Sequence, residues 1–471
     1  MKVLLALMFF PRGGSAQVTR YLAGSLAENG WEPTIVAGSA PGQADARRFF
    51  RGLDVRPVDY SRALESDNPL RADPPMHPSF EDRADAPDRV FARVDDATYE
   101  HLVDAWEEIL LDAGAADADL IHLNHLTPMN EAAERACPDV PRVGHLHGTE
   151  LLMLARIDDG PPAGWDHAAE WAERLRRWAR SCDRLLVLSP DAVRRVPELL
   201  GVDPVRVVWA PNGFDPGTFD RRPRTGQDRV ALWREWLVDD PRGWTPADRE
   251  PGSVWYSKGD LSAFADDAPV LLYVGRYTEV KRIPLLLRAY ARAREEFAVR
   301  APLVIVGGYP GEWEGEHPHD VIAETGAEDV FLAGWHDHDD LADALNASDV
   351  VVLPSVHEQF GQVIVEAMAC GLPPVAIDAH GPATIIEAGE DGWLVAPDDE
   401  AAMADALVEA VSDGDERRRR GRNAYESSRA RYSWPALARE VAGVYDDVIA
   451  GEPESRTAPG PRGGRAPQSS G

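Results

Sequence analysis

Short runs of apolar, β-branched residues alternate with amphipathic segments of helical period through most of the 471-residue chain. In the first half the pattern predicts strands at 2–9, 119–123, 142–147, 184–188 and 205–209. In the second half it predicts strands at 269–275, 302–307, 329–333, 349–353 and 374–378. Such alternation is typical of parallel sheets that helices cover on both faces. The sequence therefore predicts an α/β chain with two doubly wound sheets.

Turn signals and changes of composition divide the chain into five parts. The first domain is expected to end at the turn Pro211-Asn212-Gly213, and residues 213–268, which lose their period and carry four tryptophans among acidic residues, to form a linker with an insertion. The remaining parts are a second domain at 269–425, a final helix at 426–450 and a tail at 451–471 whose composition predicts disorder. Residues 60–95, rich in Pro, Asp and Arg, predict a long surface loop.

Charge and cysteine content exclude several classes of protein. The formal net charge of -31 disfavours binding to nucleic acid or to an anionic membrane, because both need a basic surface. Three widely spaced cysteines argue against a disulfide framework and for a reducing compartment. The apolar start, which runs into Pro-Arg-Gly-Gly, is interpreted as a first buried strand rather than a signal peptide. We expect a cytoplasmic protein with no nucleic-acid partner and at most peripheral membrane contact.

The stretch VVVLPSVHEQFGQVIVEAMACGLPPVAI places two glutamates around a helix start. The strand at 349–353 leads into a loop at its carboxyl end, where sheets of this class bind ligands. Gly361 and Gln362 then open a helix whose unpaired N–H groups can face an anion. Glu358 stays in the loop and Glu366 lies about one turn inside the helix. The alternative is that both acids only stabilise the helix start through its dipole.

The stretch LLYVGRYTEVKRIPLLL places Arg276 and Lys281 just after another strand. Two fixed cations at this position would stabilise a diphosphate leaving group as it gains charge. The alternative is a solvated pair of charges at a helix start, which is less favourable because cations oppose the dipole there.

Histidines follow two strands of the first half. In PRVGHLHGTE a strand presents His147 at its end, where it could donate a hydrogen bond to a hydroxyl or phosphate of a bound ligand. His122, Asn124 and His125 follow another strand; a metal pair is conceivable, but no third ligand is evident, and we expect these side chains to line the acceptor side without metal. The helix at 165–180 carries three tryptophans and four arginines, and packing against the sheet is favoured over lying on a membrane.

These motifs together resemble those of a known enzyme family. Pro354-Ser355, Glu358, Phe360-Gly361 and Glu366-Ala367-Met368 resemble the Glu-x7-Glu signature of the family-four retaining glycosyltransferases, also called glycosyl transferases group 1. The Arg276 to Lys281 segment and the His147-Gly148 pair resemble two further motifs of that family. The resemblance spans residues 1–42, about 115–219 and 269–450, and it implies the GT-B fold. In that fold two Rossmann-like, doubly wound domains face each other across a cleft, with the donor on the second and the acceptor on the first.

The resemblance also implies residue roles. Glu366 would bind the ribose of the nucleotide, Glu358 would lie by the donor sugar, and Arg276 and Lys281 would grip the diphosphate. The donor-binding set would be completed by Gly14, Phe360, Gly361, Gln362 and Gly381. One departure is Thr384, which stands where the family usually has a glutamate.

The function implied is retaining, metal-independent transfer of a hexosyl group. The co-substrate would be a nucleotide-diphosphate sugar, with no other cofactor, and the acceptor a small molecule, a glycan or a lipid-linked hydroxyl. Two alternatives stay open. One is a nucleotide-sugar epimerase of the same fold, and the other is a degenerate protein that binds the sugar nucleotide without turning it over.

Overall fold

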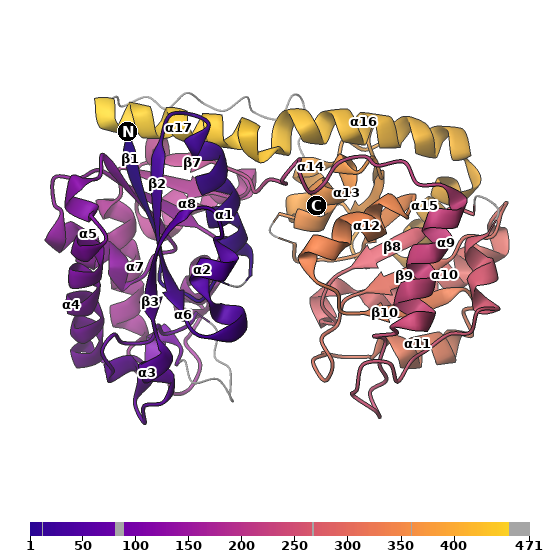
Figure 1. The fold of residues 1–471 in the computed structure, drawn as a ribbon, viewed down its shortest axis with the longest axis horizontal. Coiled ribbons are helices and arrows are strands. Elements are labelled where there is room, and N and C mark those ends of the chain that lie inside the picture. The colour runs from indigo at the N-terminus through magenta and orange to yellow at the C-terminus, as the bar shows by residue number, and fades with distance from the viewer. Residues whose placement is uncertain (12, 81–88, 266–267, 359, 452–471) are drawn as a thin grey trace. The chain divides into compact units, whose positions relative to one another are not determined.

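The structure is a computed structural model that describes residues 1–11, 13–80, 89–265, 268–358 and 360–451. The chain forms two compact units (Figure 1). The first is Met1–Asn212 together with the chain from Trp434 onward, and the second is Gly213–Ser433. Apart from Gly451, the tail for which we predict disorder lies outside the described residues.

Within the described residues, the first unit contains a seven-stranded sheet in the order β3-β2-β1-β4-β5-β6-β7, all parallel. Its strands are β1 (Lys2–Leu7), β2 (Glu32–Ser39), β3 (Asp54–Asp59), β4 (Leu120–Asn124), β5 (Arg142–Leu146), β6 (Arg184–Val187) and β7 (Val207–Trp209). Five of the six residues of β1 are buried, which explains its continuous apolar sequence and confirms that the apolar start is a core strand.

Helices cover both faces of this sheet. One face packs on α3 (Ser61–Leu64), α4 (Asp96–Asp112), α5 (Pro128–Ala136), α6 (Thr149–Asp158), α7 (Ala168–Ser181) and α8 (Pro190–Leu200). The other packs on α1 (Gly14–Ala27), α2 (Ala46–Phe49) and α17 (Trp434–Ala450).

The final helix differs from the prediction of one helix at 426–450. The structure has α16 (Gly414–Tyr432), which belongs to the second unit, and α17, separated by the extended residue Ser433. Pro435 explains the break, because it has no N–H to donate to the carbonyl of Arg431 and its ring crowds the preceding turn. The buried face of α17 carries Trp434, Leu437, Val441 and Tyr445.

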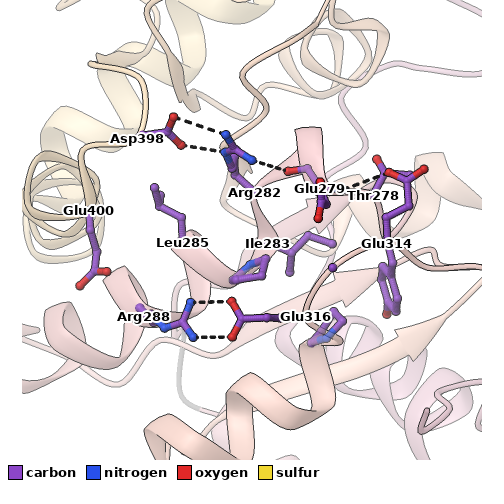
Figure 2. A pocket seen from close by; sticks show the side chains of 14 residues that line it. Thr278, Glu279, Arg282, Ile283, Leu285, Arg288, Glu314, Glu316, Asp398 and Glu400 are labelled. Atoms are coloured by element: carbon purple, nitrogen blue, oxygen red, sulfur yellow. Dashed lines mark hydrogen bonds and ion pairs between the residues drawn. The ribbon is translucent and has the colours of Figure 1, made fainter. Parts of the chain in front are cut away.

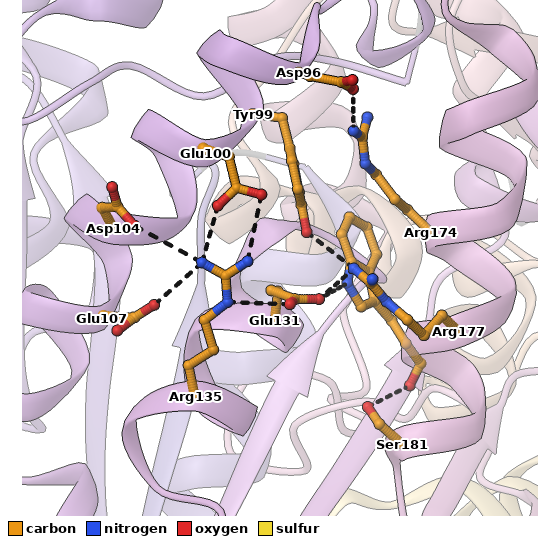
Figure 3. A network of polar contacts seen from close by, with 11 residues as sticks. Asp96, Tyr99, Glu100, Asp104, Glu107, Glu131, Arg135, Arg174, Arg177 and Ser181 are labelled. Atoms are coloured by element: carbon orange, nitrogen blue, oxygen red, sulfur yellow. Dashed lines mark hydrogen bonds and ion pairs between the residues drawn. The ribbon is translucent and has the colours of Figure 1, made fainter.

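The basic, aromatic segment predicted at 165–180 contains α7, whose aromatic face is internal. Trp171 and Trp178 are fully buried in the core of the first unit. Two of its arginines bind carboxylates of α4 and α5: Arg174 Nη2 lies 2.5 Å from Asp96 Oδ1, and Arg177 is paired with Glu131 (Figure 3). The prediction that this helix packs on the sheet is confirmed. No helix in the described part of the chain combines the length and the apolarity needed to cross a bilayer.

The prediction of a surface loop at 60–95 is wrong for nearly half of its described residues, which are buried. Leu70, Met76, Phe91 and Val94 are buried in the core of the first unit. The segment folds as short helical turns joined by backbone bonds such as Ser79 N–H to the carbonyl of Arg89, at 2.8 Å. Such turns bury residues at irregular intervals, so they show no period. Residues 81–88 of this segment lie outside the described part.

The second unit has a six-stranded parallel sheet within its described residues, in the order β10-β9-β8-β11-β12-β13. Its strands are β8 (Leu271–Val274), β9 (Leu303–Val306), β10 (Val330–Gly334), β11 (Val350–Leu353), β12 (Pro374–Ile377) and β13 (Trp393–Val395). Its helices are α9 (Gly226–Arg234), a π-helix (Glu235–Asp239), α10 (Ile283–Ala293), α11 (Pro318–Thr325), α12 (Leu341–Asn346), α13 (Gln362–Ala369), α14 (His380–Ile385), α15 (Glu400–Ser412) and α16. The two doubly wound sheets confirm the predicted fold class.

Residues 213–268 are not the linker that we expect from the sequence, because they belong to the second unit. Trp233, Trp236 and Trp244 are buried in its core, next to the outer strand β10. The insertion uses backbone groups of that strand: Leu332 N–H donates to Tyr256 Oη at 2.7 Å. An uncovered outer strand exposes unpaired N–H and C=O groups, so covering β10 is a physical reason for an apolar insertion here.

Candidate functional site

The strand order of the second sheet reverses between β8 and β11, which lie side by side. Loops that leave the carboxyl ends of two such strands diverge and open a crevice for a ligand. Residues 275–282 follow β8, and residues 354–361 follow β11. The chain thus brings Arg276, Lys281 and Glu358 to the same side of the sheet.

An ion pair joins these two loops. Lys281 is paired with Glu358, and only 18% and 20% of the two side chains are exposed. Val356 N–H also donates to the carbonyl of Val280, at 3.0 Å. In contrast, the Arg276 side chain is exposed and, within the described residues, its guanidinium makes no hydrogen bond or ion pair. The structure therefore presents one paired and one available cation at the carboxyl end of β8.

A third segment reaches this side of the sheet through Gly381 at the start of α14. Its N–H donates to the carbonyl of Glu358 at 2.9 Å. A Cβ atom placed on Gly381 would lie 2.1 Å from the carbonyl oxygen of Phe360. Gly361, with φ 102°, turns the chain into α13. The predicted residues Glu358, Phe360, Gly361 and Gly381 are therefore in direct contact, and the contact requires glycine at 381.

Glu366 is buried, with 2% of its surface exposed, on the second turn of α13. Its Oε1 accepts hydrogen bonds from Gln362 Nε2 and His338 Nε2, each at 2.9 Å. Gln362 Nε2 also donates to the carbonyl of Gly213, at 2.7 Å. His338 was not identified from the sequence, and no signal could have found it, because the contact joins segments 28 residues apart.

A glycine-rich loop after β9 also belongs to this region and was missed. Gly307 N–H donates to the carbonyl of Gly334 at 2.7 Å, and a Cβ on Gly307 would lie 2.1 Å from the carbonyl oxygen of Gly275. Trp244 of the insertion donates its indole N–H to the carbonyl of Gly308, at 2.9 Å. The pair Gly307-Gly308, at the end of the predicted strand at 302–307, was the available signal.

A pocket of about 500 Å³ lies beside the start of α10, lined in part by residues 277–279 of the β8 loop (Figure 2). Arg282 Nε is 2.7 Å from Asp398 Oδ1, and Arg288 Nη2 is 2.8 Å from Glu316 Oε1. Both arginines in its lining are thus paired, and the lining carboxylates outnumber them. This pocket does not suit an anion, and Arg276 and Lys281 do not line it.

In the first unit His147 follows β5. Its Nε2 is 2.9 Å from Asn124 Oδ1, and Asn124 Nδ2 donates to the carbonyl of Ala6 at 3.2 Å. That second bond orients the amide, so His147 Nε2 carries the hydrogen. Burial, together with His145, His125 and His122, lowers the pKa of His147 well below its ordinary value. The ring is neutral, and its remaining nitrogen, Nδ1, is an acceptor rather than the donor expected from the sequence.

Glu150 fixes this part of the first unit and was not identified from the sequence. It is buried; its Oε1 accepts from His147 N–H at 3.1 Å, and its Oε2 lies 3.3 Å from His125 Nδ1. Burial raises the pKa of Glu150, but His125 and the hydrogen bonds outweigh it, so the pKa is lowered overall. Glu150 thus holds both the backbone of His147 and the ring of His125.

The expectation that His122, Asn124 and His125 line the acceptor side is wrong. All three are buried, and His122 Nδ1 contacts Tyr445 Oη of α17 at 2.5 Å. His145 is also buried, with neither ring nitrogen hydrogen-bonded among the described residues, and burial lowers its pKa to about 3. In the part that the structure describes, no group of three or more His, Cys, Asp or Glu side chains is placed to hold a metal.

Gly14 is the first residue of α1, directly after the turn that follows β1. Gly13 before it has φ 83°, a conformation that favours glycine. A Cβ at either position would meet no atom within 4 Å. Packing within the protein therefore does not require a glycine at position 14, and the donor-binding role of Gly14 stays a prediction.

Comparison with known proteins places the chain in a family. Residues 12–218 match the model of Glycosyltransferase Family 4, and residues 261–427 match Glycosyl transferases group 1. A D-inositol 3-phosphate glycosyltransferase of Stackebrandtia nassauensis is 34% identical over 275 residues, which cover 57% of this chain and 54% of that protein. A protein of the same name from Kineococcus radiotolerans is 31% identical over 330 residues, covering 66% of this chain and 67% of the relative. The chain spans about half the length of the first of these relatives.

Solved structures agree on the fold. Sucrose-phosphate synthase of Thermosynechococcus elongatus has a TM-score of 0.65 at 20% identity, covering 96% of this chain and 100% of that chain. Anabaena HepE in complex with UDP-glucose has a TM-score of 0.60 at 18% identity, covering 95% and 100%. The GT-B fold implied by the sequence motifs is confirmed. The chain belongs to the group 1 glycosyltransferases.

Proposed function

We propose that the protein transfers a sugar from a nucleotide-diphosphate sugar to a hydroxyl acceptor with retention of the anomeric configuration. The observation that carries the proposal is the meeting of three loops at the carboxyl ends of β8, β11 and β12. Lys281 pairs with Glu358, whose carbonyl accepts from Gly381 N–H at 2.9 Å. Family membership and the UDP-glucose bound by the HepE structure support a nucleotide-sugar donor.

In this proposal the donor is held by the second unit. Lys281 and the exposed Arg276 bind the diphosphate. The ammonium group of Lys281, which is paired with Glu358, then also donates hydrogen bonds to the phosphate oxygens. Glu366 accepts hydrogen bonds from the ribose hydroxyls, while Gln362 and His338 keep its carboxylate in position. Glu358 and the backbone around Gly381 lie beside the sugar.

The chemistry needs neither a metal nor a protein nucleophile. The bond between the anomeric carbon and the diphosphate oxygen breaks, and the electron pair leaves with the nucleoside diphosphate. The acceptor oxygen bonds to the anomeric carbon on the face that the diphosphate leaves, and the acceptor proton passes to a departing phosphate oxygen. Arg276 and Lys281 stabilise the charge that develops on the diphosphate. Neutral His147 contributes Nδ1 as an acceptor for a sugar hydroxyl.

The test is a transfer assay with UDP-, GDP-, ADP- and TDP-sugars against a panel of hydroxyl acceptors. The panel includes D-inositol 3-phosphate, because relatives carry that name. We expect sugars of one nucleotide to support transfer, with one nucleoside diphosphate released for each glycoside formed. NMR of the glycoside should show the same anomeric configuration as the donor sugar. Lys281→Ala should lose activity, whereas Lys258→Ala, which removes an exposed lysine of the same unit, should keep it.

The other outcomes reject the proposal in different ways. An isomerised nucleotide sugar without glycoside would make the protein an epimerase. Tight binding of the donor with no turnover against any acceptor would make it a degenerate sugar-nucleotide binder. A product of inverted configuration would keep the transferase but refute the mechanism.

A further inference from the structure

A second pocket lies on the opposite side of the second sheet, at the amino ends of its strands. Ser348 and Asp349, which line it, precede β11, and residues 370–373 precede β12. Its volume is about 230 Å³. Seven arginines line it, namely Arg221, Arg222, Arg224, Arg229, Arg417, Arg418 and Arg422. They come from the start of the insertion and from α16.

The charge of this pocket opposes that of the chain. Asp349 is the one carboxylate among its described lining residues, against seven guanidinium groups. The whole chain has a formal net charge of -31. A cluster of cations in so acidic a protein does not follow from its composition.

Three of the arginines have a structural role. Arg229 Nη2 is 2.5 Å from Asp349 Oδ2, and its Nε donates to the carbonyl of Ala347 at 3.1 Å. Arg224 is paired with Asp343. Arg417 Nη1 donates to the carbonyls of Ala410 and Val411 at the end of α15, at 2.8 and 2.9 Å. These contacts hold the wall of the pocket in place.

Two more arginines also have protein partners: Arg222 Nη2 donates to the carbonyls of Gly217 and Thr218, at 3.0 and 3.2 Å, and Arg418 Nη2 is 2.6 Å from Asp415 Oδ1. Such contacts do not account for the remaining two. In the described part of the chain the guanidinium groups of Arg221 and Arg422 make no hydrogen bond or ion pair. The Arg221 side chain lies beside Gly371, where a Cβ would be 3.2 Å from its Cδ. Among the described residues Arg224 Nε is buried without a hydrogen-bond partner, and Arg417 forms no ion pair with a carboxylate. Burial lowers the pKa of Arg417, and the negative charges of Asp349 and Asp413 offset only part of this effect.

We propose that this pocket binds a small anion that carries two or more phosphate groups, at a site separate from the proposed donor site. Guanidinium groups bind phosphate oxygens in a fork of two parallel hydrogen bonds, and unpaired arginines are the residues suited to this. The volume equals that of roughly seven or eight water molecules at about 30 Å³ each, which suits a short anion rather than a polymer. The proposal does not rest on the proposed transferase activity.

Inorganic tripolyphosphate is the probe, titrated calorimetrically at low salt. Because the donor site would also bind phosphates, the starting protein is Arg276→Ala/Lys281→Ala. We expect it to bind tripolyphosphate, and adding Arg221→Ala/Arg422→Ala should weaken binding at least roughly tenfold, the scale of losing charge-assisted bonds. Adding Arg194→Ala/Arg195→Ala instead removes two exposed arginines of α8 and should change nothing.

Two results would overturn the proposal. One is equal affinity with and without Arg221 and Arg422, and the other is no binding by the starting protein. If the alanine variant does not fold, as judged by circular dichroism, Arg221→Lys/Arg422→Lys replaces it. That variant keeps both charges and loses the fork geometry, so it should bind more weakly than the starting protein, and unchanged affinity would equally reject the site.

Discussion

Replacing Gly381 with alanine tests the close approach that joins the loops after β11 and β12. The built Cβ would lie 2.1 Å from the carbonyl oxygen of Phe360, and 2.4 and 2.5 Å from its carbonyl carbon and Cα. The first distance is 1.3 Å short of 3.4 Å, where ordinary van der Waals contact begins. All three atoms are backbone, so no side chain can move away to relieve the overlap.

The cost of Gly381→Ala should resemble that of overpacking a core. We expect the free energy of unfolding to fall by about 1–3 kcal/mol. The residues around Glu358 should also shift, because Gly381 N–H donates to its carbonyl. Donor affinity should therefore fall in protein that is still folded. Urea unfolding and calorimetric titration of the nucleotide sugar measure the two effects.

Gly226→Ala is the matched control for this variant. Gly226 lies in the same unit at the start of α9, and a Cβ there would meet no atom within 4 Å. Its stability should stay the same or rise slightly, since alanine favours the helix. If Gly381→Ala has the stability and donor affinity of the wild type, the contact between Gly381 and Phe360 is not as described and the reasoning fails.

Three further variants test separate parts of the account. Arg276→Ala should raise the transfer barrier by about 2–4 kcal/mol, a loss of roughly 30- to 900-fold in kcat/KM, without changing the melting temperature; wild-type rates would reject Arg276 as a phosphate ligand. Trp244→Phe should lower the free energy of unfolding by about 1–3 kcal/mol, because it leaves the carbonyl of Gly308 without its indole donor; an unchanged urea midpoint would count against that bond. The pKa of His145 in the folded protein is about 3, below the ordinary 6.5, so protonation of this ring favours the unfolded chain. The free energy of unfolding is therefore unaffected by His145 above pH 6.5 and falls on acidification, by about 2 kcal/mol at pH 5. His145→Leu should show a smaller loss between pH 7 and pH 5 in urea unfolding, and equal losses would refute the assignment.

Periodicity predicted the elements whose residues are buried at regular intervals. The central strands β1, β8 and β11 are almost entirely apolar, β4 is buried along its whole length, and all four were found. Strands β2, β3 and β13 were missed; β3 has alternating exposure and contains charged residues. The apolar residues around Met76 and Phe91 were missed as core because short turns bury them without a period.

The motifs of the second unit predicted which residues meet, because each follows the carboxyl end of a strand. Glu358, Gly361 and Gly381 are in contact for that reason. Contacts that depend on packing between distant segments could not be predicted. Examples are His338 with Glu366, and the indole of Trp244 with the loop after β9. For the same reason the burial of His122 against Tyr445 contradicts its expected place on a surface.

Thermal stabilisation of the protein by UDP-, GDP-, ADP- and TDP-sugars tests most directly whether the second unit holds a nucleotide-sugar donor. Wild type is compared with Glu366→Gln, which alters the buried carboxylate, and with the control Glu295→Gln, which alters an exposed one. The account predicts that one nucleotide raises the melting temperature of the wild type and of Glu295→Gln, and that Glu366→Gln loses most of this rise. No rise with any nucleotide sugar, or an equal rise in Glu366→Gln, would contradict it.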